Sequence, residues 1–158
     1  MILLTPELRF ALRANDLARG AAARDDRPEP DPVPVVKFFN PLGAATWLAT
    51  ELFDDGDSCF GLADLGFGSP ELGVFSLSAM ASIRLPFGMG IERDVAFATT
   101  HRLSTWAEWA RRAGSILWAE QLLGSGDAQH RGTAAEDERL LRRAASPPGD
   151  DELPPSGG

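Results

Sequence analysis

Two acidic residues on neighbouring apolar stretches are the strongest candidates for chemistry in this sequence. Glu51 lies in TWLATELF and has the same strand parity as the apolar residues Trp47 and Ala49. Asp64 lies in CFGLADL and shares its parity with Phe60. Two carboxylates held close together repel each other, which raises the pKa of at least one of them. General acids and metal sites are built in this way.

The register of these two stretches in a hairpin decides whether the two acids meet. One register pairs Phe53 with Phe60. In that register Asp64 lies opposite Ala49 and is a diagonal neighbour of Glu51. A shift of one residue puts the acids on opposite faces instead. Acids at strand ends also commonly point to water or pair with an arginine from a helix, so the sequence leaves a catalytic pair and two structural carboxylates as alternatives.

A longer stretch around these acids is acidic and contains no basic residue. The chain has 15 Lys and Arg residues, but none of them falls between positions 38 and 83. A surface of fixed carboxylates attracts basic protein surfaces and can imitate the phosphates of nucleic acids. We therefore predict a binding surface for a basic protein partner, formed by Asp54, Asp55, Asp57, Asp64 and Glu71.

The overall composition argues against several other classes of function. A net charge of −8 disfavours direct binding of nucleic acid or of an anionic membrane. The two histidines and the single Cys59 stand in no metal-binding pattern, and no phosphate loop or nucleophile elbow is present. We expect no metal and no cofactor. The absence of a long apolar run, of a signal-like N-terminus and of paired cysteines predicts a cytoplasmic protein without a membrane span.

The elements that must position these residues indicate an α+β protein. Thr5 and Pro6 begin a helix that we expect to stop at Gly20. A polar, proline-rich linker loop follows over residues 20–33. Apolar stretches separated by frequent turn residues predict an antiparallel β-meander of four to five strands with flanking helices. The expected strands cover residues 34–39, 44–53, 59–65, 73–77 and 93–99.

The C-terminal third of the chain divides into a helix and a tail. Ser78 is expected to cap a short helix, and a capping box at Thr105 begins a longer helix that stops near Gly124. The residues beyond it are poor in large apolar side chains. We predict a single domain over residues 1–124 and a low-complexity, mostly disordered tail over residues 125–158.

Several blocks of the sequence resemble one known family. LLTPELR, PVVKFFNPLGAATWLATEL, FGLADLGFGSPELG, SLSAMASIR and IERDVAF occur in this order. They resemble a family of small bacterial proteins described only as a domain of unknown function and often encoded on plasmids and integrative conjugative elements. The similarity runs from about Leu3 to Ala113. The resemblance carries no activity, cofactor or catalytic residue with it, but it implies a setting of conjugation, plasmid maintenance and counter-measures against host defence.

Together these observations favour a non-enzymatic interaction protein of a mobile genetic element. It would bind a basic protein partner through its acidic surface, and its concrete form would be anti-restriction or anti-CRISPR action by nucleic-acid mimicry. The alternative is a small enzyme with Glu51 and Asp64 as an acid/base or metal pair. Acids that converge in a pocket favour the enzyme, whereas acids spread over a convex surface favour the binding module.

Overall fold

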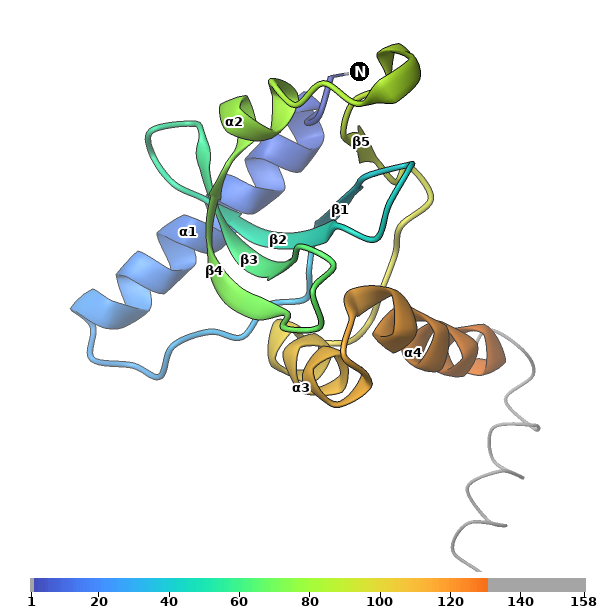
Figure 1. The fold of residues 1–158 in the computed structure, drawn as a ribbon. Helices are drawn as coiled ribbons and strands as arrows, with labels where there is room; N and C mark the ends of the chain where they lie inside the picture. The colour runs from blue at the N-terminus through green and yellow to red at the C-terminus, as the bar shows by residue number, and fades with distance from the viewer. Residues whose placement is uncertain (1, 131–158) are drawn as a thin grey trace, which may run out of the picture. The chain divides into compact units, whose positions relative to one another are not determined.

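The computed structural model describes residues 2–130 of the chain (Figure 1). Residues 1–121 form one compact unit, and a second unit begins at Leu122. The tail predicted to be disordered lies outside the described residues from position 131 onward. Among residues 2–130, no helix is long and apolar enough to span a lipid bilayer.

A five-stranded antiparallel sheet with the strand order β4-β3-β2-β1-β5 forms the centre of the fold. Each of the first three strands pairs with the next one along the chain, so the predicted α+β meander with flanking helices is confirmed. The fifth strand is far shorter than the expected 93–99 and pairs with β1. The strands are β1 (Val36–Phe39), β2 (Thr46–Leu52), β3 (Ser58–Asp64), β4 (Glu71–Ser76) and β5 (Glu92–Arg93).

Strand β2 carries a bulge that changes its register against β3. Ala49 pairs with Gly61, whereas Glu51 pairs with Phe60, so Thr50 is the extra residue. The backbones approach closely beside the bulge. A Cβ atom at Gly61 would lie 1.8 Å from the carbonyl oxygen of Leu48, which explains why a glycine stands at this position of the strand.

The helices are α1 (Pro6–Arg24), α2 (Leu77–Ala81), α3 (Leu103–Ala113) and α4 (Ile116–His130), with a 3-10 turn η1 over Pro86–Gly88. Thr5 caps α1 as predicted, because its hydroxyl accepts a hydrogen bond from the Leu8 N–H at 3.2 Å. The expected stop at Gly20 is wrong, since α1 continues for one more turn. Ser76 rather than Ser78 caps α2.

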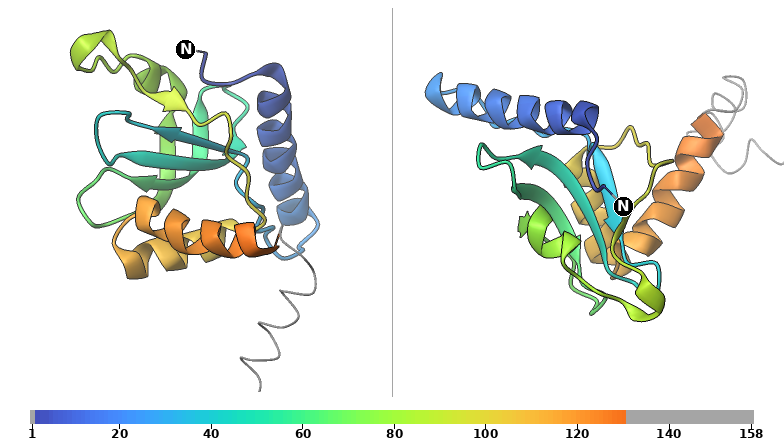
Figure 2. Two further views of the ribbon diagram at one scale, coloured as in Figure 1. Left: turned by 90° about the vertical axis from the view of Figure 1, so that its right-hand side faces the viewer. Right: turned by 90° about the horizontal axis from the view of Figure 1, so that it is seen from above.

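Helices cover both faces of the sheet (Figure 2). On one face, Leu12 of α1 belongs to the same buried cluster as Phe38 and Trp47. On the other face, Leu48 and Leu62 are directly paired and fully or almost fully buried. Helix α3 contacts β3 and β4 on that second side. The sheet therefore separates two layers of apolar side chains.

The start of α3 does not use the predicted capping box. The helix begins two residues before Thr105, and its N-cap residue Arg102 makes no side-chain capping bond. Asp31 in the linker supplies the cap from a distance. Its carboxylate accepts a hydrogen bond from the Ser104 N–H at 3.1 Å and another from the Ser104 hydroxyl. The linker is thereby fastened to the first turn of α3.

Gly114 divides the predicted C-terminal helix into two. It has a φ of 84°, a left-handed conformation that ends a helix and that glycine adopts without steric cost. Helix α4 then begins at Ile116 and continues past the expected stop at Gly124 to His130.

Candidate functional site

Glu51 is a buried carboxylate held by an arginine from α1. Its side chain is only 5% exposed, and it accepts a hydrogen bond from Nε of Arg19 at 2.5 Å. Arg19 also donates to Asp16 at 2.8 Å. The hydrogen bond with Glu51 is the main cause that raises the pKa of Arg19 above its ordinary value. Glu51 is thus one half of an ion pair between a strand and a helix.

Asp64 is fully buried at the end of β3 and binds backbone N–H groups. One carboxylate oxygen accepts from the Gly66 N–H at 2.8 Å, and the other accepts from the Ile116 N–H at 2.8 Å. The N–H groups in the first turn of a helix lack helical partners, and a negative charge at that end is stabilised by the helix dipole. Asp64 therefore fastens the start of α4 to the sheet. A residue so deeply buried cannot belong to the predicted partner-binding surface.

Glu51 and Asp64 do not form the predicted pair. Asp64 lies opposite Thr46 rather than Ala49, and Glu51 lies opposite Phe60. The two acids are four residues apart along the strand direction, a separation of about 13 Å. The predicted register is wrong for two reasons. The β2–β3 turn is tighter than expected, since Phe53 already pairs with Ser58. The bulge in β2 then adds a further offset.

Asp55 and Asp57 organise the β2–β3 turn and its neighbour α2. The carboxylate of Asp55 accepts hydrogen bonds from the N–H and the hydroxyl of Ser58, which lower the pKa of Asp55. Asp57 accepts from the Ser76 hydroxyl at 2.6 Å and from the Ser78 N–H at 2.7 Å, which lower the pKa of Asp57. Both carboxylates remain ionised near neutral pH, but their oxygens are already engaged inside the protein.

Arginines from α1 reach the acidic stretch that contains no basic residue in sequence. Arg9 donates to the carbonyl oxygen of Gly56 at 3.0 Å, and Arg13 donates to that of Leu52 at 2.7 Å. Among the predicted partner-binding residues, only Asp54 and Glu71 are exposed and make no side-chain hydrogen bond or ion pair within residues 2–130. The acidic stretch is therefore partly neutralised in space.

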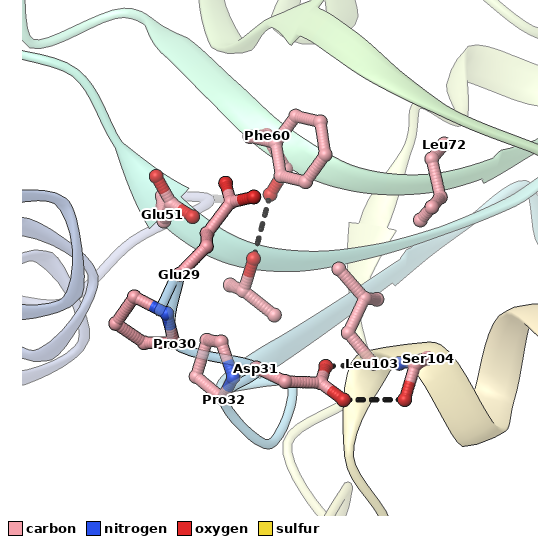
Figure 3. Close-up of a pocket in the computed structure, with 10 residues that line it drawn as sticks. Glu29, Pro30, Asp31, Pro32, Glu51, Phe60, Leu72, Leu103 and Ser104 are labelled. Carbon is pink, nitrogen blue, oxygen red and sulfur yellow. Dashed lines mark hydrogen bonds between the residues drawn. The ribbon is translucent and has the colours of Figure 1, made fainter. Parts of the chain in front are cut away.

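A groove of about 230 Å³ opens between the linker, the sheet and the start of α3 (Figure 3). Its walls are mainly apolar, because Phe60 and Leu72 contribute from the sheet and Leu103 from α3. Pro30 and Pro32 of the linker close the opposite side. The prolines fix an extended chain, so this wall needs no regular secondary structure.

Three carboxylates line the same groove, and they differ in what they bind. Asp31 is engaged by Ser104, and Glu51 is engaged by Arg19. Glu29 is exposed, and no ion pair of its carboxylate is present among the described residues. In Figure 3 its side chain points toward Phe60, on the side of the groove where Glu51 lies. Glu29 and Asp31 were not among the predicted site residues, because the linker that carries them shows no regular pattern.

A buried lysine forms a second charged cluster elsewhere on the sheet. The side chain of Lys37 in β1 is 8% exposed, and its ammonium group lies 2.7 Å from Glu120 and 3.4 Å from Asp94. The cluster ties the sheet to α4 and to the residue after β5. The sequence held a signal for it, since Lys37 is the only lysine of the chain and stands inside an apolar strand.

Nucleophilic and metal chemistry find no support in the described part of the chain. Burial raises the pKa of the Cys59 thiol to about 12, so it stays protonated at neutral pH and is a poor nucleophile. Within residues 2–130, no group of His, Cys, Asp or Glu side chains is arranged to hold a metal ion.

The fold and the groove define a small α+β protein with an acidic-rimmed apolar groove on one face of its sheet. The chain belongs to the DUF2958 family of proteins of unknown function, whose model matches residues 3–117. The predicted resemblance to an uncharacterised family is thereby confirmed. The matched range includes all the groove residues and the contact of Asp64 with Ile116. No curated protein and no solved structure matched the chain significantly.

Proposed function

We propose that this chain is a non-enzymatic interaction protein and that its groove binds a basic, extended segment of a protein partner. The observation that carries the proposal is the combination of apolar walls with the exposed carboxylate of Glu29. A lysine or arginine side chain needs both features, because its aliphatic stem packs on apolar surface while its cationic head seeks a carboxylate.

Glu29 is the acid that a partner can bind without displacing a hydrogen bond of the protein. Asp31 and Glu51 already accept hydrogen bonds inside the protein, so a new cation would have to share them. Both still contribute negative potential at the groove. The positive charge of Arg19, which is paired with Glu51, offsets part of that potential. Clefts lined by one sign of charge and by low-dielectric walls concentrate that potential and attract oppositely charged groups.

The acidic β2–β3 turn is the competing surface for the same kind of partner. Asp54 is exposed there, and Asp55 and Asp57 keep their charge. Arg9 and Arg13 approach the same turn and oppose a long-range negative field. Nucleic-acid mimicry requires a broad array of unneutralised carboxylates, so the groove is the better-supported binding site.

For the biological setting we retain a mobile genetic element and a cytoplasmic location, and we propose DNA-binding proteins of host defence as candidate partners. Such proteins present basic surfaces by necessity, since they bind phosphates. Support for this setting comes from the family resemblance described above and from the carboxylates at the groove. The proposal excludes an enzyme built on Glu51 and Asp64, because each of these acids is committed to a different helix.

The test is a pull-down from host cells with the full chain as bait, followed by affinity measurements on a basic peptide from the captured protein. Glu29→Gln should weaken peptide binding about two- to fivefold, and Glu29→Arg should weaken it by more than tenfold. Asp54→Asn is the matched control, because it removes another exposed carboxylate, one that lies outside the groove. A loss of binding in Asp54→Asn with normal binding in Glu29→Arg would place the site at the β2–β3 turn instead.

A further inference from the structure

Strand β4 is an open edge of the sheet with exposed apolar side chains. It stands at one end of the strand order, and no other strand among residues 2–130 pairs with its outer side (Figure 1). Leu72 is 47% exposed and Val74 is 60% exposed. The pairing with β3 runs through six consecutive residue pairs without a register break, so the edge is straight enough to accept another strand.

The backbone groups that face outward can be assigned from the hydrogen-bond pattern. The Leu77 N–H donates to the Asp57 carbonyl oxygen at 2.9 Å, which continues the β3–β4 ladder by one pair. Hydrogen-bonded and non-hydrogen-bonded pairs alternate along an antiparallel ladder. Gly73 and Phe75 therefore bond to β3, and Leu72 and Val74 direct their N–H and C=O groups away from the sheet.

This edge lacks the features that usually keep sheet edges from pairing. Natural proteins protect them with lysines, prolines, bulges or very short strands. The opposite edge follows that rule, because β5 is two residues long. Strand β4 contains no lysine, no proline and no bulge, and its single charge is Glu71 at the first position.

We propose that β4 pairs antiparallel with β4 of a second copy of this chain, with Gly73 at the two-fold axis. The outward groups sit at Leu72 and Val74, whose side chains share one face of the sheet. Leu72 then lies opposite Val74 of the second copy, and the exposed apolar side chains of the two copies cover one another. Leu72 also lines the groove, but the pairing does not depend on what the groove binds.

Three observations favour self-pairing in this register. Centring on Gly73 uses every outward N–H and C=O of Leu72 and Val74 in both copies, whereas centring on Val74 requires the carbonyl of Ser76, the residue that caps α2. The Gly73 register places Glu71 opposite Phe75, so the only charge of the strand never meets its own copy. A Cβ atom at Gly73 would meet no atom within 4 Å, so no described residue covers that face of the strand at the proposed axis.

Sedimentation equilibrium of the full chain over a wide concentration range tests the proposal. The wild-type protein should form a dimer. Val74→Lys should raise the dissociation constant at least about tenfold, because it places two added charges near the axis. Val95→Lys is the matched control, since Val95 is 76% exposed just beyond β5 at the opposite edge, and it should dimerise normally. A wild-type monomer at every concentration, or a dimer unaffected by Val74→Lys, would overturn the proposal.

Amide hydrogen exchange supplies a second measurement that needs no variant. In a monomer the amides of Leu72 and Val74 face solvent and exchange rapidly, while those of Gly73 and Phe75 are protected by β3. Dimer formation should slow exchange at Leu72 and Val74 at least about tenfold as concentration rises. Rapid exchange at these two amides in concentrated protein would rule out this interface, even if the chain associates by another surface.

Discussion

Two acids of the acidic stretch hold two different helices, and they do so by different chemistry. Glu51 binds α1 through the guanidinium group of Arg19, so that a charge meets a charge. Asp64 binds α4 through the backbone N–H of Ile116, so that a charge meets a helix N-terminus. The comparison shows that a cluster of acids in the sequence does not by itself indicate a binding surface. The folded chain can use each carboxylate to bind one of its own helices.

Glu51 and Asp64 are the two anchors of these helices, and the largest difference between them should appear when each carboxylate is removed. Asp64→Ala leaves the N–H groups of Gly66 and Ile116 without their acceptor in a buried site, so we expect a loss of about 3 kcal/mol in the free energy of unfolding. Asp64→Asn keeps one acceptor oxygen and should lose about half as much. Urea denaturation followed by circular dichroism measures both, and a loss below that of the exposed control Glu71→Ala would contradict the anchor.

Removal of the other anchor should cost less. Glu51→Ala leaves Arg19 with Asp16 as a remaining partner and with partial access to water, so we expect a loss of about 1.5 kcal/mol. The same denaturation experiment gives the value. The paired variant Arg19→Met with Glu51→Leu removes both charges together, and it should recover part of that loss. A Glu51→Ala variant less stable than Asp64→Ala would reverse the order of the two anchors.

The turn between the anchors should make stability depend on acid pH. The hydrogen bonds of Asp55 and Asp57 lower both pKa values from an ordinary value of 3.8. Their stabilising contribution is therefore complete above that value and is lost as pH falls through the lowered values. Melting temperatures measured from pH 7 down to about pH 2 should fall below about pH 4. Asp57→Asn should flatten that fall, and an unchanged slope would mean that other groups cause it.

The smallest effect is expected at the groove, where the carboxylate holds nothing. Glu29→Gln should change the free energy of unfolding by less than about 0.5 kcal/mol, because Glu29 is exposed and no ion pair of it exists among residues 2–130. The thermal melt of this variant provides the check. A clear loss of stability would mean that Glu29 is a structural residue like Glu51, and would remove the free carboxylate on which the proposed function rests.

Local signals predicted much of the fold correctly. Thr5 with Pro6 marked the start of α1, and β-branched and aromatic residues between turn signals marked four strands. These features depend on residues close together in sequence. The cap of α3 was missed for the opposite reason, since Asp31 lies more than seventy positions away from Ser104 and no local pattern connects them.

The candidate site was harder to predict than the fold because it depends on register. Glu51 and Asp64 were recognised as acids on apolar stretches, and that observation was right for both. The alternative of a structural carboxylate paired with an arginine from a helix holds for Glu51. The catalytic pair fails because a bulge at Thr50 and a tighter turn displace one strand against the other. A bulge requires only one extra residue, and neither Thr50 nor its neighbours differ from ordinary strand residues.

The sequence by itself determined the class of fold, the approximate positions of the first four strands and the acidic character of the middle stretch, because propensity and periodicity are properties of neighbouring residues. Only the tertiary structure decided which acids are free. It brought the arginines of α1 to the acidic turn, buried Asp64 beneath the start of α4 and left Glu29 exposed beside apolar side chains. Charge pairing depends on distance in space, and that distance is set by packing.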